Sequence, residues 1–403
     1  MTGGAMTKFV YDPTTVEFQE NPLPLFKELR DRHPVYHNPD LRFWTLTRFA
    51  DVWDAVHDHE TFASDPDNYP DEPAEPTELM PKAFMDFGIF YMDPPRHNRL
   101  RSIMSRAFTV RRVSDLEPSV RRLANELIDG FIDTGRCEFV HDFAAPLSTT
   151  VIGELLGVPR DERWQFRLWA EKLEQRDPSI TVEVAQKEQQ DALAQIFEYL
   201  SGLVAARRKA PRDDLIDAII GAEVDGERLN EHEIMSMCYQ IMIAGNETTA
   251  ILMSNGVVRL AEHPDARAEL LADPRLTAGA VEEMARFDSP TVQSPPRVTT
   301  RDVTLHGRTI PKGQPVVFVW MAADHDEREF PSPERFDIHR RMDRHLGFGH
   351  GLHYCMGAPL ARLEATSAFE EFHARIPEYH LDGPPLRWAS TWLRVIGQVP
   401  LGF

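Results

Sequence analysis

Apolar residues recur at the spacing of an α-helix through most of the chain between residues 93 and 264. The longest of these patterns begins after Asn230, where Glu233 follows three positions later in the arrangement of a capping box. It continues to His263, and Pro264 ends it. A helix of this length extends for ~50 Å, so it must cross the body of the protein. An earlier helix is predicted by one apolar face, formed by Leu100, Ile103, Met104, Ala107 and Phe108.

The last third of the chain mixes helical patterns with short runs of strand character. The predicted elements are helices over 277–287 and 358–375, extended segments over 297–305, 315–321 and 392–401, and a turn at 306–308. The predicted fold class is therefore mainly α, with a small β portion and a long central helix. No shift in composition marks a domain boundary.

Charge and cysteine content exclude several classes of protein. Lys and Arg number 44 against 64 Asp and Glu, and the net charge of −20 argues against binding to nucleic acid or to an anionic membrane. Three scattered cysteines, Cys137, Cys238 and Cys355, are too few for a disulfide framework. Residues 1–10 lack an apolar signal segment, and the longest apolar run, 316–323, is far short of the ~20 residues of a spanning helix. A cytoplasmic protein is expected.

The candidate chemistry concentrates in the segment Phe348-Gly349-His350-Gly351-Leu352-His353-Tyr354-Cys355-Met356-Gly357. A single cysteine stands between glycines immediately before a predicted helix. The unpaired N–H groups at a helix start stabilise a thiolate, and the glycines let the backbone approach a flat partner closely. The segment is thus predicted to present one ionised sulfur to a planar or metallic group.

Three other interpretations stay open on these residues alone. Cys355 could be a buried inert side chain, which is the usual fate of a lone cysteine. It could be a nucleophile, although nothing identifies an orienting base. It could also join His345, His350 and His353 in a zinc site, although the paired ligand spacings of such sites are incomplete.

The run Phe348-x-x-Gly351-x-His353-x-Cys355-x-Gly357 resembles the haem-binding signature of the cytochromes P450. The resemblance implies haem b with the Cys355 thiolate as the proximal iron ligand, the ligation that favours O–O cleavage in this family. It also implies a single P450 domain over residues 1–403, with 1–20 as an N-terminal extension. The implied activity is that of a soluble, bacterial-type haem-thiolate monooxygenase using O2.

A second motif, Ala244-Gly245-Asn246-Glu247-Thr248-Thr249, falls in the middle of the long predicted helix. Taken alone, it fits a kinked helix with a solvated Glu, since a mid-helix Gly costs about 0.5–1 kcal/mol and a Thr can bond a carbonyl one turn back. It resembles the acid–alcohol pair of the P450 family. The resemblance implies that Glu247 relays protons and Thr248 assists oxygen activation, with Asn246 at a variable position.

Two further sets of residues follow from the resemblance. Glu283 and Arg286 share one helical face, and with Arg335 they resemble the structural Glu–Arg–Arg triad that supports folding and haem retention. The predicted partners of the haem propionates are His97, Arg101, Arg297 and His353, and Phe348 completes the cofactor-binding set.

The partners implied are a ferredoxin and its NAD(P)H-dependent reductase, because no electron-transfer domain is fused to the chain. Six arginines and no acid occupy positions 96 to 112, and a second basic cluster comprises Arg340, Arg341, Arg344 and His345. Together they predict a basic docking surface for an acidic ferredoxin. The substrate is predicted to be a hydrophobic small molecule, in contact with Phe87, Ile89, Phe90, Ala244, Val292 and Ser294. A steroid, terpenoid, fatty acid or aromatic acid would be compatible.

Two alternative functions are retained for comparison. A peroxide-driven haem enzyme of the same fold would not need Glu247 and Thr248, so their presence argues against it. A non-catalytic haem- or metal-binding protein would be distinguished by metal analysis.

Overall fold

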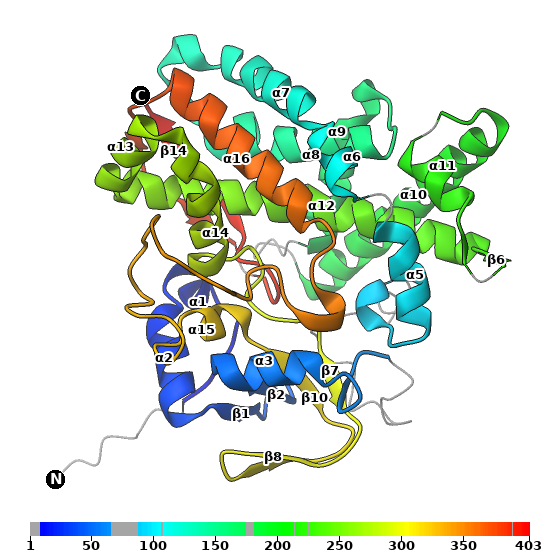
Figure 1. The fold of residues 1–403 in the computed structure, drawn as a ribbon, viewed down its shortest axis with the longest axis vertical. Helices are drawn as coiled ribbons and strands as arrows, with labels where there is room; N and C mark the ends of the chain where they lie inside the picture. Colours follow the sequence, from blue (N-terminus) through cyan, green and yellow to red (C-terminus); the bar gives the residue numbers. More distant parts are fainter. Residues whose placement is uncertain are drawn as a thin grey trace.

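The computed structural model describes residues 9–65, 88–105, 108–174, 181–212, 214–224, 226–388 and 390–403. Helix α12 (Glu231–Glu262) extends across the whole width of the molecule in Figure 1, with other helices packed around it. The further α-helices are α1 (Val16–Glu20), α2 (Leu23–Arg32), α3 (Phe49–His57), α5 (Arg96–Ser105), α6 (Val110–Ser114), α7 (Glu117–Asp129), α8 (Ala145–Leu155), α9 (Arg163–Glu174), α10 (Val182–Lys209), α11 (Leu215–Ile220), α13 (Pro264–Ala272), α14 (Thr277–Phe287), α15 (Trp320–Asp324) and α16 (Ala358–Arg375).

Helix α12 forms as its sequence predicts. Asn230 Oδ1 accepts the N–H of Glu233 at 2.9 Å, and Glu233 Oε2 accepts the N–H of Asn230 at 3.0 Å, which completes the capping box. Most of the helix is buried, as its central position requires. Gly245 lies so close to Ile152 of α8 that a Cβ at this position would overlap the Ile152 side chain. The mid-helix glycine is therefore explained by the close packing of α8 against α12.

The β portion is a five-stranded sheet at one end of the molecule, accompanied by small two- and three-stranded sheets. The sheet has the order β1 (Val35–Asn38), β2 (Phe43–Leu46), β10 (Pro315–Phe318), β7 (Arg297–Thr299) and β3 (Phe62–Ala63). Its neighbouring strands are antiparallel except for β2 and β10. The described residues also form β4 (Arg136–Glu138), β11 (His380–Leu381), β12 (Leu386–Arg387), β13 (Ile396–Gln398) and β14 (Pro400–Gly402).

One strand prediction is wrong in part. The segment 297–305 is not a single strand: it divides into β7 and β8 (Val303–Leu305), and β8 pairs with β9 (Arg308–Ile310) across the predicted turn. Thr300 still donates its N–H to Thr61 O, which extends the pairing of β7 with β3 by one residue. Beyond it, β8 pairs with β9 and not with a strand of the five-stranded sheet. The second predicted strand is also shorter, because α15 begins at Trp320.

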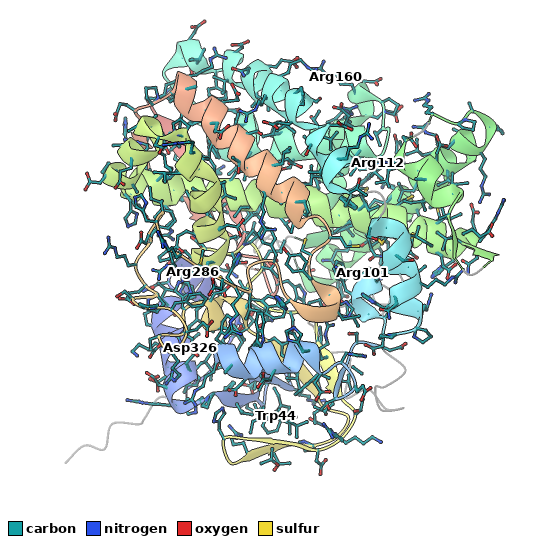
Figure 2. The ribbon with its side chains drawn as sticks, in the orientation of Figure 1. Trp44, Arg101, Arg112, Arg160, Arg286 and Asp326 are labelled. Atoms are coloured by element: carbon teal, nitrogen blue, oxygen red, sulfur yellow. The ribbon has the colours of Figure 1, made fainter. Side chains whose placement is uncertain are left out.

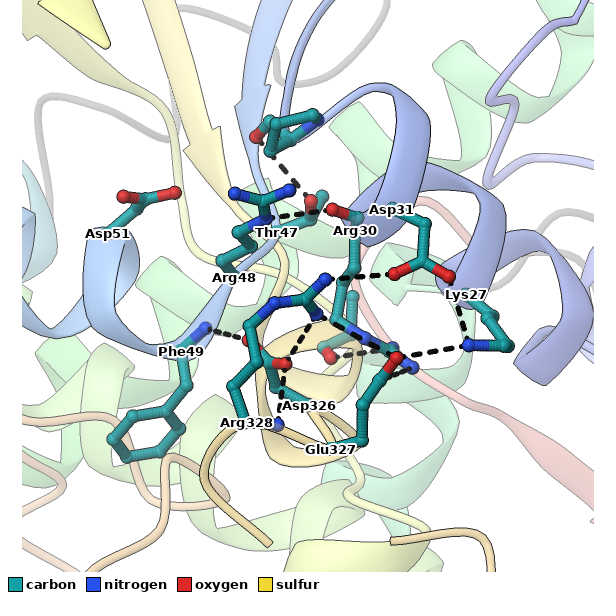
Figure 3. Close-up of polar contacts among 12 residues, drawn as sticks. Lys27, Arg30, Asp31, Thr47, Arg48, Phe49, Asp51, Asp326, Glu327 and Arg328 are labelled. Atoms are coloured by element: carbon teal, nitrogen blue, oxygen red, sulfur yellow. Dashed lines mark hydrogen bonds and ion pairs between the residues drawn. The ribbon is translucent and has the colours of Figure 1, made fainter. Parts of the chain in front are cut away.

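Helix α3 supports the cysteine loop from below, and it is fixed at its own start. Asp326 Oδ2 accepts the N–H of Phe49 at 3.0 Å, and Asp326 Oδ1 pairs with Arg328 at 2.9 Å (Figure 3). Arg328 in turn binds Asp31 of α2 at 2.9 Å. At the other end of α3, Gly351 packs so tightly on the Val56 carbonyl that no Cβ would fit. The network thus holds α3 where the cysteine loop rests on it.

The amino-terminal segment is part of the packed structure from residue 9 onward. Tyr11 is fully buried, and its hydroxyl donates to Gln293 Oε1 at 2.7 Å. Among the helices of the described residues, none combines the length and apolarity that a membrane crossing requires.

Candidate functional site

The cysteine loop leads directly into α16 (Figure 1, the orange segment), and Cys355 lies three residues before the helix begins at Ala358. Cys355 donates its N–H to Phe348 O at 2.9 Å, and Gly349 donates to Leu346 O at 2.8 Å. Gly349 and Gly351 adopt φ angles of +64° and +66°, which explains why both positions are glycine. The Cys355 side chain is exposed, whereas Cys137 and Cys238 are buried. The loop therefore displays a single accessible sulfur.

The surroundings of Cys355 act on its pKa in opposite directions. The protein around the sulfur raises the pKa of the thiol, because it weakens hydration of a thiolate. Hydrogen bonds from the backbone N–H groups of Gly357 and Ala358, and the positive charges of Arg101 and Arg362, act to lower it. The N–H donors at the start of α16 are directed at the sulfur, as the sequence predicts. The site thus supplies donors for a thiolate that also needs a cationic partner.

The four predicted propionate partners are brought together from distant parts of the chain. The rings of His97 and His353 are 4.6 Å apart between centroids and meet edge to face. Arg101 donates to Tyr354 O at 2.6 Å, and Arg297 donates to Phe90 O at 3.0 Å. Burial and the charges of Arg297, His97 and Arg101 hold the pKa of His353 well below its usual value. Arg101 and Arg297 thus bring two guanidinium groups close to His353.

An unsatisfied atom in this cluster points to a missing acceptor. His97 is buried, and its Nε2 has no hydrogen-bond partner among the described residues. A pocket lined by Ser64, Arg297 and His353 adjoins it. Buried polar atoms normally have partners, so a ligand oxygen is expected here. A thiolate donor, glycines that allow close approach and cationic groups suited to two carboxylates together fit haem b.

Arg362 is a site residue that the sequence analysis missed. Its guanidinium lies 4.3 Å from the centroid of the Phe348 ring, donates to Tyr354 OH at 2.9 Å and pairs with Glu282 at 2.5 Å. It therefore braces the cysteine loop from α16 and contributes positive charge near Cys355. The sequence offers one signal for this role, because Arg362 falls in the first turns of the predicted helix that follows Cys355.

The middle of α12 is less buried than the turns on either side of it. Ala244 is exposed, and Glu247 and Thr248 are half-buried, between turns that are almost wholly buried. Thr248 Oγ donates to Ala244 O at 2.6 Å, the backbone bond one turn back that the sequence analysis named. Glu247 lines a pocket with His141 and Trp388. The predicted acid thus lines a pocket, and the predicted alcohol follows it directly on α12.

The predicted triad forms with one change of member. Glu283 and Arg286 are fully buried and paired at 2.7 Å. The third arginine is Arg340, which lies 3.1 Å from Glu283, and the prediction of Arg335 is wrong because its side chain is exposed. The loop 331–335 curves around Arg340, which donates to the carbonyls of Pro331, Ser332 and Arg335. Arg335 thus contributes a carbonyl and not a charge.

The histidines near Cys355 each have partners other than a shared metal. His345 pairs with Glu282 at 2.9 Å, His350 hydrogen-bonds His57 at 3.0 Å and His353 hydrogen-bonds Ser64 at 3.0 Å. Over the described residues, no three His, Cys, Asp or Glu side chains are grouped as metal ligands. The geometry does not support the zinc interpretation.

The predicted substrate contacts divide into three groups. Ala244 and Phe90 are exposed and remain candidates, while Phe87 lies outside the described residues. Ile89 is buried. Val292 is fully buried in the core beside Tyr11, and Ser294 Oγ accepts the N–H of Phe318. We do not retain these last two as substrate contacts, because their side chains already have structural partners.

The predicted basic surface is smaller than the sequence suggests. Arg96, Arg111 and Arg112 are exposed, whereas Arg101 turns inward to the cysteine loop (Figure 2). Arg99 pairs with Glu233 at 3.1 Å. The prediction of a second surface cluster is wrong for Arg340 and His345, whose side chains are buried against Glu283 and Glu282. Arg106 lies outside the described residues.

Comparisons with known proteins identify the family of this chain. A sequence model of the family described as Cytochrome P450 matches residues 173–372. The chain is 40% identical over 366 residues to the Cyclomarin C epoxidase CymV of Salinispora arenicola, with 91% of each protein covered. It is 39% identical over 372 residues to the Vitamin D(3) 25-hydroxylase of Pseudonocardia autotrophica, with 90% of this chain and 88% of the relative covered. The structure of CYP109E1 from Bacillus megaterium in complex with testosterone matches with a TM-score of 0.87 and 29% identity, over 96% of this chain and 99% of that one.

The chain belongs to the cytochrome P450 family. Its fold and its relatives, which include hydroxylases and epoxidases, identify it as a P450 monooxygenase. The cofactor of this family is haem b, with the iron held by a cysteine thiolate.

Proposed function

We propose that Cys355 is the haem ligand of a monooxygenase that oxidises a hydrophobic small molecule with O2. The observation that carries the proposal is the direction of the Gly357 and Ala358 N–H groups toward the Cys355 sulfur. Donors of this kind stabilise a thiolate without giving it a proton. Cys355 is also the one cysteine of the chain with an accessible side chain.

The remaining cofactor roles follow from the cationic cluster. His97, Arg101, Arg297 and His353 would hold the propionates, and the free Nε2 of His97 would then gain its acceptor. When bound, haem supplies the iron at which O2 is reduced. Glu247 would bring protons from the pocket that it lines, and the Thr248 hydroxyl next to it would pass them on. Phe348, whose ring lies against the Arg362 guanidinium, would complete the set of residues that hold the cofactor.

Removing the Thr248 hydroxyl tests this assignment. Thr248→Ala should keep the haem and its substrate-induced spectral change while it diverts electrons from product to hydrogen peroxide. Thr249→Ala, at the adjacent buried position, is the matched control. Product formation that stays fully coupled in Thr248→Ala would remove Thr248 from the mechanism. Faster product formation by wild type with peroxide alone than with O2, ferredoxin and reductase would favour the peroxide-driven alternative.

The substrate is proposed to be a rigid apolar molecule of steroid size. The relatives named above are a Cyclomarin C epoxidase and a Vitamin D(3) 25-hydroxylase, and one of the similar structures is in complex with testosterone. In this chain the candidate contacts that remain exposed, Ala244 and Phe90, are apolar. An optical titration of the ferric protein with steroids, terpenoids, fatty acids and aromatic acids tests the class. A Soret shift with steroids alone is expected, and a shift with only fatty acids would contradict it.

Electrons are proposed to come from a separate ferredoxin and its NAD(P)H-dependent reductase. Arg96, Arg111 and Arg112 remain exposed on the α5–α6 side, and the protein as a whole is strongly acidic. A local basic surface on such a protein steers an acidic partner, and added salt weakens that steering. Arg112→Glu should slow reduction by ferredoxin at low salt and should reduce its salt dependence. A rate insensitive to both salt and this substitution would contradict the proposal.

A further inference from the structure

Asn246, at the variable position of the acid–alcohol motif, joins three helices through its side chain. It is buried at 3% exposure in the middle of α12. Its Oδ1 accepts a hydrogen bond of 2.5 Å from Thr149 Oγ on α8, and its Nδ2 donates to Phe166 O on α9 at 3.3 Å. The side chain therefore connects the oxygen-activation segment to two neighbouring helices at once.

The chemistry of the three groups fixes which way the amide points. A backbone carbonyl only accepts, so the NH2 group must face Phe166 O, and the amide oxygen then accepts from the Thr149 hydroxyl. Neither a carboxylate nor a hydrocarbon of the same size can make both bonds. The two contacts thus require an amide, or a carboxyl that carries its proton, at position 246.

The two bonds differ in what they add to the structure. The packing of Gly245 on Ile152 already holds α8 against α12, so the Thr149 bond reinforces a contact that exists without it. The bond to Phe166 reaches a carbonyl inside α9, where an α-helix supplies its own N–H partners. The bond therefore connects α12 to α9 in addition to the hydrogen bonding within α9, and the Phe166 carbonyl does not depend on it for a partner.

The hydrogen bond from Asn246 to Phe166 O joins two parts of the protein that have different roles. Residue 246 directly precedes Glu247 and Thr248, so any displacement of its side chain acts on the backbone that carries them. Helix α9 presents exposed apolar side chains, Trp164 and Leu168, one turn apart on the same face. These two side chains give α9 a surface that an apolar substrate can contact.

We propose that Asn246 is a positioning residue that couples the seating of α9 to proton delivery by Glu247 and Thr248. This proposal rests on the proposed function. It adds that the presence of substrate controls whether the reduction of O2 leads to product. When α9 is seated, the bond to Phe166 O holds the α12 backbone in the arrangement that passes protons. When the bond is absent, electrons are still delivered but leave as hydrogen peroxide.

Three variants separate the two bonds. Asn246→Leu keeps the volume and removes both bonds, whereas Thr149→Val removes only the α8 bond. Asn246→Asp keeps the acceptor for Thr149 but turns a carboxylate oxygen toward Phe166 O. Ser254→Ala, also buried on α12, is the control, because the Ser254 hydroxyl has no hydrogen-bond partner among the described residues.

Product formed per NAD(P)H consumed is the primary readout, with the reductase, a ferredoxin and the substrate found by titration. Asn246→Leu is expected to lower this ratio about fivefold, the factor that corresponds to one net hydrogen bond. Thr149→Val and Ser254→Ala should remain within a factor of two of wild type (roughly the scatter of such effects). Product formation driven by added peroxide should be unchanged in all four, because peroxide brings its own electrons and second oxygen.

The aspartate variant gives a pH signature that loss of packing would not produce. A buried carboxyl without a cationic partner has a raised pKa, and once protonated it can donate to Phe166 O. In Asn246→Asp, the amount of product formed per NAD(P)H consumed should therefore increase as the pH is lowered, while wild type should show no such increase. This variant also keeps the test available if Asn246→Leu fails to fold.

Three results would overturn the inference. If Asn246→Leu forms as much product per NAD(P)H consumed as wild type, the two bonds of Asn246 do not affect oxygen activation. If Thr149→Val lowers this ratio as much as Asn246→Leu does, the effect comes from the bond to α8. Parallel loss of peroxide-driven activity and haem content would show a purely structural role. Failure of the proposed function is distinguishable from all three, because wild type itself would then form no oxygenated product.

Discussion

The guanidinium of Arg101 donates a hydrogen bond of 2.6 Å to the carbonyl oxygen of Tyr354, the residue that precedes Cys355. One residue of α5 thereby touches the cysteine loop directly, and the charge of Arg101 also acts on the Cys355 sulfur. The bond explains why α5 and the loop, more than 250 positions apart in sequence, form one wall of the site.

Substitution of Arg101 should release haem more readily. Arg101→Gln removes a charged donor to Tyr354 O and one candidate propionate partner. Hydrogen bonds to charged groups contribute about 1.5–3 kcal/mol, so haem affinity should fall by roughly tenfold or more. The measurement is the rate of haem transfer to an acceptor protein, with Arg112→Gln on the exposed face of α6 as the control. Equal transfer rates for the two variants would contradict the role given to Arg101.

Arg340 and Arg335 should differ sharply in their contribution to stability. Arg340→Ala leaves the fully buried Glu283 with a single arginine and removes three bonds to backbone carbonyls. Breaking a buried pair costs about 3–5 kcal/mol, so the free energy of unfolding should fall by that amount. Arg335→Ala, at an exposed position, should change it by no more than about 0.5 kcal/mol. Urea unfolding measures the free energy of unfolding of both variants. A larger loss in Arg335→Ala than in Arg340→Ala would show that Arg335 is the third member of the triad, as the sequence predicts.

Asp324 should make the stability depend on pH. This carboxyl is fully buried next to the cysteine loop, where Oδ1 accepts the N–H of Leu346 at 2.8 Å. Burial raises its pKa to about 7, against an ordinary value of 3.8, and Glu283 adds to the increase while His345 and Arg286 oppose it. The unfolded chain loses this proton near pH 4, whereas the folded protein keeps it until about pH 7. The contribution of Asp324 to the free energy of unfolding therefore falls as pH rises through this interval.

Asp324→Asn isolates that contribution, because the amide keeps the acceptor for Leu346 and cannot ionise. The variant should gain stability relative to wild type between pH 4 and pH 7, by roughly 2–4 kcal/mol at neutral pH. Asp382→Asn, at an exposed aspartate, should not alter the pH profile. Parallel profiles for wild type and Asp324→Asn would show that Asp324 is ionised throughout.

Local signals in the sequence were sufficient for the long elements and for the cysteine loop. Asn230 and Glu233 cap α12 as predicted, and the N–H groups of Gly357 and Ala358 face the sulfur because a helix start dictates that geometry. The arrangement of His97 and Arg101 on one face of α5 likewise follows from helical spacing.

Contacts between distant segments determined the features that the sequence did not reveal. Arg340 replaces Arg335 because the carbonyls of the loop 331–335 surround its guanidinium, which no local pattern indicates. Ser294 was predicted to meet substrate, but its hydroxyl accepts the Phe318 N–H of a neighbouring strand. The bonds of Asn246 to α8 and α9 are of the same kind: a variable position in a motif gains its role from helices brought to it by the fold.

The central claim is that the Cys355 thiolate binds the haem iron, and the spectrum of the reduced protein with carbon monoxide tests it most directly. Wild type should show the Soret band at the long-wavelength position that thiolate ligation produces. Cys355→Ala should lose this band, while Cys137→Ala and Cys238→Ala should retain it. Retention of the long-wavelength band in Cys355→Ala, or its absence from wild type that contains haem, would contradict the account.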